Sequence, residues 1–141
     1  NKHISGKSVA SNIKVKNNEI LSDIMSKNWT DTYKRKVLKV YNEFQDNNLN
    51  VSDHFAVSYL KRINSSNIDK EKLLNTMKDK VKFKEWNERK KEFNLIRYDE
   101  VNLIRVVSNK DDTVYITFMI DKENQIKNKL EKGVWLEYDN G

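Results

Sequence analysis

The fold is decided by residues 114–120, which are Val114-Tyr115-Ile116-Thr117-Phe118-Met119-Ile120. Every second side chain of this stretch, beginning with Val114, is aliphatic or aromatic. Side chains of a strand point alternately to the two faces of a sheet, so this period of two predicts a strand with one buried face. We expect Val114, Ile116, Phe118 and Ile120 to face the core.

One more strand is predicted on each side of this stretch. Residues 101–107 and 134–138 are rich in β-branched and aromatic residues, and polar turns at 108–112 and 121–124 separate the strands. In the last strand we expect Val134, Leu136 and Tyr138 on one face, and Trp135 and Glu137 on the other. Residues 94–98, or the polar start of the chain, are candidates for a fourth strand.

Upstream of residue 82 the apolar residues recur every three or four positions, which is typical of amphipathic helices. Thr30 or Asp31 can cap the longest helix, Ser52 can cap the next and Asp69 the third. The charged segment 82–92 either extends the third helix or forms a loop that leads into the sheet. The clearest apolar stripe is Trp29, Tyr33, Val37, Val40, Tyr41 and Phe44.

Helices first and strands afterwards, without alternation, predict an α+β domain. We expect N-terminal helices packed on one face of a C-terminal curved antiparallel sheet, in a cone-like or cystatin-like arrangement. A chain of 141 residues suits a single domain, 1–141. Within it we expect a flexible lead-in over 1–17, mainly helices over 18–92 and mainly strands over 93–141.

The composition indicates a folded, basic protein. Aromatic residues make up 10% of the chain and the formal net charge is +6. Nine basic and five acidic residues lie between 70 and 92, against five basic and seven acidic residues between 110 and 141. The basic excess therefore lies near the junction of helices and sheet. The candidate patch for an anion or a nucleic acid is Lys82, Lys84, Arg89, Lys90 and Lys91.

No catalytic, cofactor-binding or metal-binding site is predicted, and we expect no enzyme. The chain has no Cys and only two imidazoles, His3 and His54, and its three glycines lie too far apart for a phosphate loop. Two carboxylate pairs occupy adjacent positions, Asp99 with Glu100 and Asp111 with Asp112. Adjacent strand residues point to opposite faces, so we interpret both pairs as solvated charges.

The last strand also suggests an interface. If Val134 and Leu136 face the core, Trp135 must be buried elsewhere or meet a partner, and aromatic anchors dominate contact energies. A second packed layer is the alternative. The candidate interface residues are Trp135, Glu137, Tyr115 and Met119.

The order of these features resembles a known superfamily. Helices followed by a curved antiparallel sheet, here the long helix over 29–44 and then the strands 101–107 and 114–120, is the order of the nuclear-transport-factor-2-like superfamily and also of cystatin-like domains. The start Asn1-Lys2-His3-Ile4-Ser5-Gly6 is similar to the segment that follows the membrane anchor in one member, the scaffold protein named next. Within the superfamily the chain is similar to the soluble domain of the bitopic scaffold protein of type IV secretion and conjugation systems. It is also similar to the membrane-tethering subunit of mitochondrial import. Steroid-isomerase-like members need an Asp base and a Tyr donor inside the cone, and no such pair can be assigned here.

The resemblance implies a non-catalytic assembly domain beside a membrane. We therefore expect a binding or scaffold domain that works with protein partners, as a homo-oligomer, on the extracytoplasmic face of a membrane. The chain begins at Asn1 and stops after Asn140-Gly141, so we expect a segment of a longer protein, with an anchor or another domain outside it. A natural terminus after removal of the initiator Met is the alternative. Alternatives are a nucleic-acid-associated basic protein, and an enzyme with carboxylates or Tyr in a cone pocket.

Overall fold

The helices begin at the capping residues that the sequence predicts. The computed structural model describes residues 17–65 and 68–138, and for residues 63–65 it describes the backbone alone. Thr30, Ser52 and Asp69 each accept a backbone N–H from the first turn of the helix that follows. The helices are α1 (residues 17–26), α2 (Asp31–Asp46), α3 (Asp53–Ser65), α4 (Lys70–Lys78) and α5 (Gln125–Glu131).

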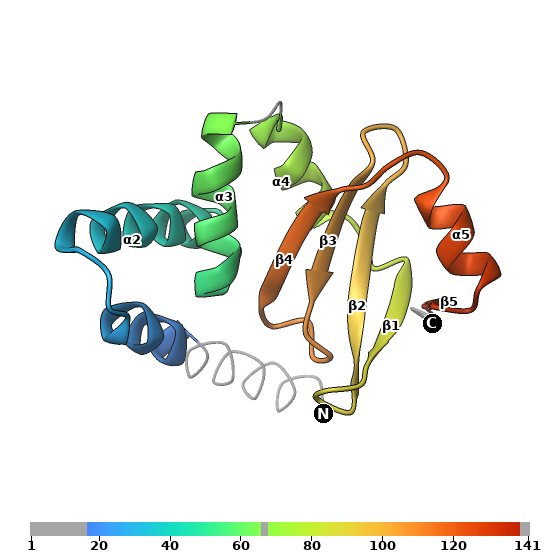
Figure 1. Cartoon of the computed structure of the whole chain (residues 1–141), viewed down its shortest axis with the longest axis horizontal. Coiled ribbons are helices and arrows are strands. Elements are labelled where there is room, and N and C mark those ends of the chain that lie inside the picture. The colour runs from blue at the N-terminus through green and yellow to red at the C-terminus, as the bar shows by residue number, and fades with distance from the viewer. Residues whose placement is uncertain (1–16, 66–67, 139–141) are drawn as a thin grey trace.

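In the described part of the chain, the strands form one open antiparallel sheet of five strands in the order β4-β3-β2-β1-β5. Figure 1 shows α2, α3 and α4 on one side of this sheet and α5 beside β1 and β5. The predicted α+β class, with N-terminal helices on one face of a C-terminal antiparallel sheet, is confirmed. The strands are β1 (Phe83–Asn87), β2 (Glu92–Asp99), β3 (Ile104–Ser108), β4 (Tyr115–Ile120) and β5 (Trp135–Glu137).

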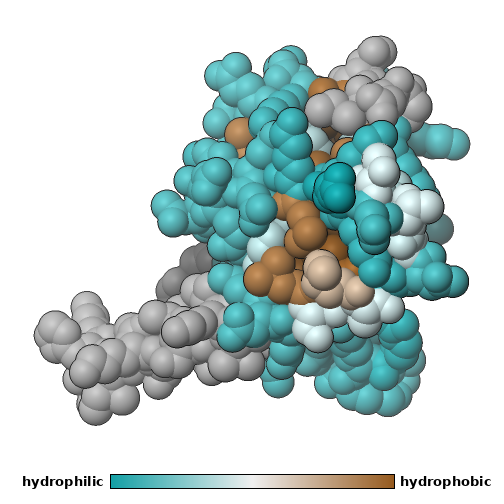
Figure 2. Space-filling model, turned by 90° about the vertical axis from the view of Figure 1, so that its left-hand side faces the viewer, coloured by the Kyte–Doolittle hydropathy of each residue, from teal (hydrophilic) through white to brown (hydrophobic). Residues whose placement is uncertain are grey.

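One face of the sheet packs against the helices. Val106 of β3 and Phe118 of β4 are directly opposite each other and fully buried under α3 and α4. Phe118 contacts Phe55 of α3, which packs edge-to-face on Phe44 of α2. This helix-side core therefore continues from β4 through α3 to α2. At the end of the molecule formed by α1 and α2, a hydrophobic patch is left among hydrophilic residues (Figure 2).

The opposite face of the sheet has a smaller core of its own. Trp135 stacks on Phe83 with ring centroids 5.4 Å apart and meets Tyr98 edge-on at 5.6 Å. Val107 and Ile96 complete this α5-side core, and Ile126 of α5 packs against it. The central strands β2 and β3 are thus covered on both faces.

Each of these two strands buries an arginine that an aspartate neutralises. On the helix side, Arg97 binds the Asp112 carboxylate through two nitrogens at 2.7 and 2.6 Å. On the other side, Arg105 binds Asp121 at 3.0 and 2.6 Å, and its guanidinium lies 5.2 Å from the Trp135 ring. Bidentate pairing of this kind satisfies the fixed geometry of guanidinium. Burial alone would lower the pKa of Arg97, but the Asp112 carboxylate, together with Tyr115 and Asp79, more than offsets burial, so that this pKa is raised.

Two predicted segments need correction. The helical region does not extend to residue 92, because α4 ends at Lys78 and segment 82–92 forms β1, a turn and the start of β2. The strand predicted over 101–107 begins later than expected, because residues 100–103 form a turn and β3 begins at Ile104. Asp99 and Asn102 build this turn by local hydrogen bonds, which compete with strand pairing. Residues 94–98 do supply a fourth strand, within β2. The lead-in over 1–17 lies outside the described residues, except for Asn17.

The predicted buried face of β4 is correct for two of its four residues. Val114 and Phe118 are buried, Ile116 is half-buried and Ile120 is 47% exposed. The register shifts so that Val107 faces Thr117 whereas Ser108 faces Tyr115, and Ile116 is the extra residue. A bulge of this kind breaks the period of two.

The outer edge of β4 is covered by the segment that precedes α3. The Tyr115 N–H donates to the carbonyl of Asn50, and the Ser52 N–H donates to the carbonyl of Tyr115. The Ser52 hydroxyl then bonds the Ile116 carbonyl at 2.8 Å, and Arg62 of α3 bonds that of Phe118 at 2.7 Å. At the other end of the sheet, β5 has a strand neighbour on one side only among the residues that the structure describes.

Truncating Phe118 to Ala should lower the free energy of unfolding by about 3–5 kcal/mol, because it leaves a cavity in the helix-side core. Ile120→Ala is the matched control on the same strand, and its loss should stay below about 1 kcal/mol because the side chain is half exposed. Urea denaturation measures both. Equal losses would contradict the assigned burial.

Replacing Asp121 by Asn should lower the free energy of unfolding by about 3–5 kcal/mol, since Arg105 would be left buried without a counter-charge. The exposed Asp111→Asn is the control and should change stability by no more than about 0.5 kcal/mol. Denaturation at neutral pH compares the two variants. An Asp121→Asn protein as stable as the control would show that Arg105 does not need the aspartate.

Candidate functional site

The helices cover only part of one face of the sheet. On that face, the outer strands β1 and β5 are left uncovered by the described helices. Cross-strand partners point to the same side of a sheet. Lys84 pairs with both Leu95 and Leu136, and Trp86 pairs with Phe93, so these side chains share the helix side with Arg97. In the described residues α3 packs on β4, and α4 on β2 and β3, but neither packs on β1 or β5. We call the four residues Lys84, Trp86, Phe93 and Leu136 the outer-strand surface.

The outer-strand surface is apolar and partly exposed. Trp86 is 47% and Leu136 45% exposed. Trp86 meets Phe93 edge-on with centroids 5.0 Å apart, and the Lys84 ammonium lies 4.6 Å from the centre of the Phe93 ring. The Trp86 indole N–H donates to Glu88 at 2.7 Å. These contacts hold the aromatic side chains in place without burying them.

Trp135 is not at the surface. It is 1% exposed, and its indole N–H donates to Glu85 at 3.0 Å. Trp135 therefore belongs to a second packed layer, which was the alternative to an interface. Val134 and Leu136, expected to face the core, are partly exposed instead. The two faces of β5 are therefore the reverse of the prediction, because α5 covers the face that the sequence left without a partner. Glu137, on the Trp135 face of β5, is exposed.

The other predicted interface residues lie at the far edge of the sheet, on β4. Tyr115 is half-buried, its hydroxyl donates to the Met77 carbonyl, and the Arg97 guanidinium lies 5.3 Å from its ring. Met119 is half-buried on the opposite face, paired with Arg105. The structure therefore does not bring Tyr115 and Met119 together with Trp135.

The predicted basic patch is divided. Lys82 bonds the Tyr98 carbonyl at 2.6 Å and pairs with Asp79 at 3.6 Å. Lys91 pairs with Glu88. The Lys91 ammonium, with the Trp86 indole, holds the pKa of Glu88 below its usual range. Lys84 lies on the outer-strand surface.

Two members of the patch have neither an ion pair nor an aromatic contact for their side chains in the described residues. Arg89 and Lys90 are exposed in the turn between β1 and β2, and their side chains have no partner in the described parts of the chain. Cationic recognition of an anion at this turn would therefore depend on two side chains rather than five.

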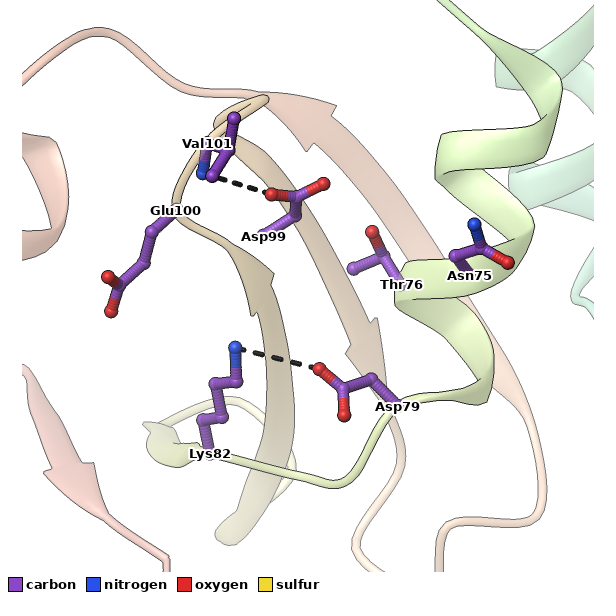
Figure 3. Close-up of a pocket in the computed structure, with 7 residues that line it drawn as sticks. All are labelled: Asn75, Thr76, Asp79, Lys82, Asp99, Glu100 and Val101. Carbon is purple, nitrogen blue, oxygen red and sulfur yellow. Dashed lines mark hydrogen bonds and ion pairs between the residues drawn. The ribbon is translucent and has the colours of Figure 1, made fainter.

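A hollow of about 360 Å³ lies between the end of α4 and the turn that follows β2 (Figure 3). Its lining includes Lys82 and three carboxylates, those of Asp79, Asp99 and Glu100. The carboxylates are spread around the rim (Figure 3), and no group of His, Cys, Asp or Glu in residues 17–65 and 68–138 could hold a metal ion. His54 is exposed on α3, and His3 lies outside the described residues.

Among the residues that line this hollow, Asp99 has a structural role. Burial would raise the pKa of Asp99. Hydrogen bonds from the Asn102 side chain and from the backbone of Asn102 and Val101 outweigh this effect, so the pKa of Asp99 is lowered. A carboxyl held in its ionised form cannot serve as a proton donor near neutral pH. Glu100 is exposed as predicted, whereas Asp112, interpreted as solvated, is bound to Arg97.

Comparisons with protein-family models, with curated proteins and with solved structures found no match to this chain. Among the described helices, none combines the length and apolar character needed to cross a bilayer. The function has to be argued from the surfaces described above.

Replacing Asp99 by Ala should lower the free energy of unfolding by about 1–2 kcal/mol at pH 7, because three hydrogen bonds to the ionised carboxylate are lost. A lowered pKa in the folded state contributes stability above the ordinary Asp pKa of about 3.9, and this contribution disappears as the pH falls through the folded value. The difference between the proteins should therefore shrink below about pH 4. Glu100→Ala is the control and should show no effect. A difference that does not depend on pH would contradict the role of the ionised group.

Proposed function

We propose that the chain is a non-catalytic binding and scaffold domain of a membrane-associated assembly, such as a secretion or conjugation complex, and that it contacts its partners through the outer-strand surface. One observation carries the proposal. The helix layer ends over β2, and Trp86 and Leu136 stay about half exposed on the strands beyond it.

The outer-strand surface has two properties of a protein contact. Trp anchors flanked by apolar side chains supply most of the binding energy at interfaces. The surface also adjoins β5, whose outer side has no neighbouring strand within the described residues, and an open edge can pair with a strand of a partner. The partner we propose is a second copy of this chain, which would extend the sheet from β5 to β5.

The choice of a membrane-associated assembly rests on the order of the elements. Four helices followed by an antiparallel sheet is the order expected from the resemblance to the nuclear-transport-factor-2-like superfamily and its type IV secretion scaffold. Fold analogy of this kind says little about function by itself. It supports the proposal only together with the outer-strand surface.

Sedimentation equilibrium at increasing concentration should show self-association of the wild-type chain, and Trp86→Ala and Leu136→Ala should each weaken it at least about tenfold, because they remove anchors. Val101→Ala is the matched control, since Val101 is 89% exposed at a turn away from this surface. A wild-type chain that stays monomeric at every concentration contradicts the dimer. Equal weakening by the control contradicts the surface.

A nucleic-acid role is the second candidate, and one observation favours it. Arg89 and Lys90 lie in the turn next to the Trp86–Phe93 pair, and cations beside exposed aromatic rings suit a single strand of DNA or RNA. Two phosphate contacts predict a shallow salt dependence, with a slope of about −1.4 for single strands. Absence of binding at low ionic strength would remove this candidate.

A further inference from the structure

A second hollow, of about 350 Å³, lies between α2, α3 and the start of α4. Three lysines and a single carboxylate surround it, so positive charge predominates. Aliphatic and aromatic side chains from α2 and α3 contribute its apolar walls. The lining residues are Lys36, Lys39, Val40, Glu43, Tyr59, Leu60 and Lys70.

Tyr59 is the unusual member of this hollow. The residue is 4% exposed, and its buried hydroxyl has no hydrogen-bond partner within residues 17–65 and 68–138. A buried hydroxyl without a partner costs free energy, and such groups in native structures call for an explanation. Burial raises the pKa of Tyr59; the charge of Lys70, which lines the same hollow, lowers it, and that of Glu43 raises it. At neutral pH it is protonated and can donate a hydrogen bond.

The lysines around Tyr59 are available to a ligand. Lys36 and Lys39 lie one turn apart on α2, and no ion pair holds either of them within the described residues. Lys70 pairs with Glu43 at 3.3 Å, but both side chains are exposed by more than 40%. Exposed pairs contribute little to stability, so a ligand anion can displace the Glu43 carboxylate at small cost.

We propose that this hollow binds a small organic anion, whose carboxylate or phosphate accepts hydrogen bonds from the lysines and, once the side chains above it move aside, from the buried Tyr59 hydroxyl. A short apolar body would pack on Val40 and Leu60. The lining is apolar with a few convergent polar groups, which is typical of small-molecule sites. A free organic acid and the headgroup of an anionic lipid share this chemistry. The site is separate from the outer-strand surface, and the inference does not depend on the proposed function.

Calorimetric titration with butyl phosphate, hexanoate and inorganic phosphate tests the site, together with vesicles that contain phosphatidic acid or only phosphatidylcholine. Saturable 1:1 binding is expected for an organic anion, with inorganic phosphate about tenfold weaker because it lacks the apolar body. Binding of the free acids identifies a soluble ligand, and binding confined to phosphatidic acid identifies a headgroup. Absence of binding to every probe overturns the proposal.

Substitutions locate the site. Tyr59→Phe should fold with unchanged or higher stability, because it removes the unpaired hydroxyl, and should bind about tenfold more weakly. Lys36→Gln with Lys39→Gln should weaken binding further, and Glu43→Gln should strengthen it by removing a competing carboxylate. Arg35→Gln is the matched control, because Arg35 is adjacent to Lys36 on α2 but does not line the hollow. Binding that is unchanged in Tyr59→Phe and in the double lysine variant, or weakened equally in Arg35→Gln, overturns the assignment.

Discussion

The structure depends on the burial of β2 and β3 on both faces. A strand that is covered on one side only can direct its polar residues to water, but all five residues of β3 are buried. Arg97 and Arg105 are carried on opposite faces of this pair of strands, and each needs a carboxylate within the protein. Asp112 and Asp121 supply the carboxylates from the two ends of the β4 segment. The turns around β4 are therefore fixed by charge as well as by the backbone.

The double cover explains where the free surfaces lie. On one face, α3 and α4 cover β4, β3 and β2 and leave Trp86 and Leu136 of the outer strands partly exposed. On the other face, α5 and its Ile126 cover the smaller core, which buries Trp135. The exposed aromatic residue of the sheet is consequently Trp86 rather than Trp135. The hollow around Tyr59 arises separately, where α2, α3 and α4 meet and their lysines surround an unpaired hydroxyl.

Local chemistry in the sequence was enough to predict the class of the fold and several of its boundaries. Thr30, Ser52 and Asp69 mark helix starts because a cap needs only a side-chain oxygen and the next few N–H groups. The alternation over residues 114–120 identifies β4, although the bulge at Ile116 changes its register. The strand β1 was missed because each of its faces carries a charged residue, Lys84 or Glu85, which masks the period of two. Which face of β5 is buried depends on α5, a helix that the sequence pattern did not reveal. The ion pairs of Arg97 and Arg105 were missed because their partners are 15 and 16 residues away along the chain.

The most direct test of the double cover uses the absence of cysteine from the chain, since each introduced thiol is then the only one. Val106→Cys and Val107→Cys place thiols on the two faces of β3, and Leu136→Cys places one on the outer-strand surface. The rate of thiol labelling under native conditions should be high for the thiol at 136. At 106 and 107 it should be lower by a factor of at least about 1,000, because labelling there requires unfolding. Rapid labelling at either 106 or 107 would show that one face of β3 is open and would contradict the account.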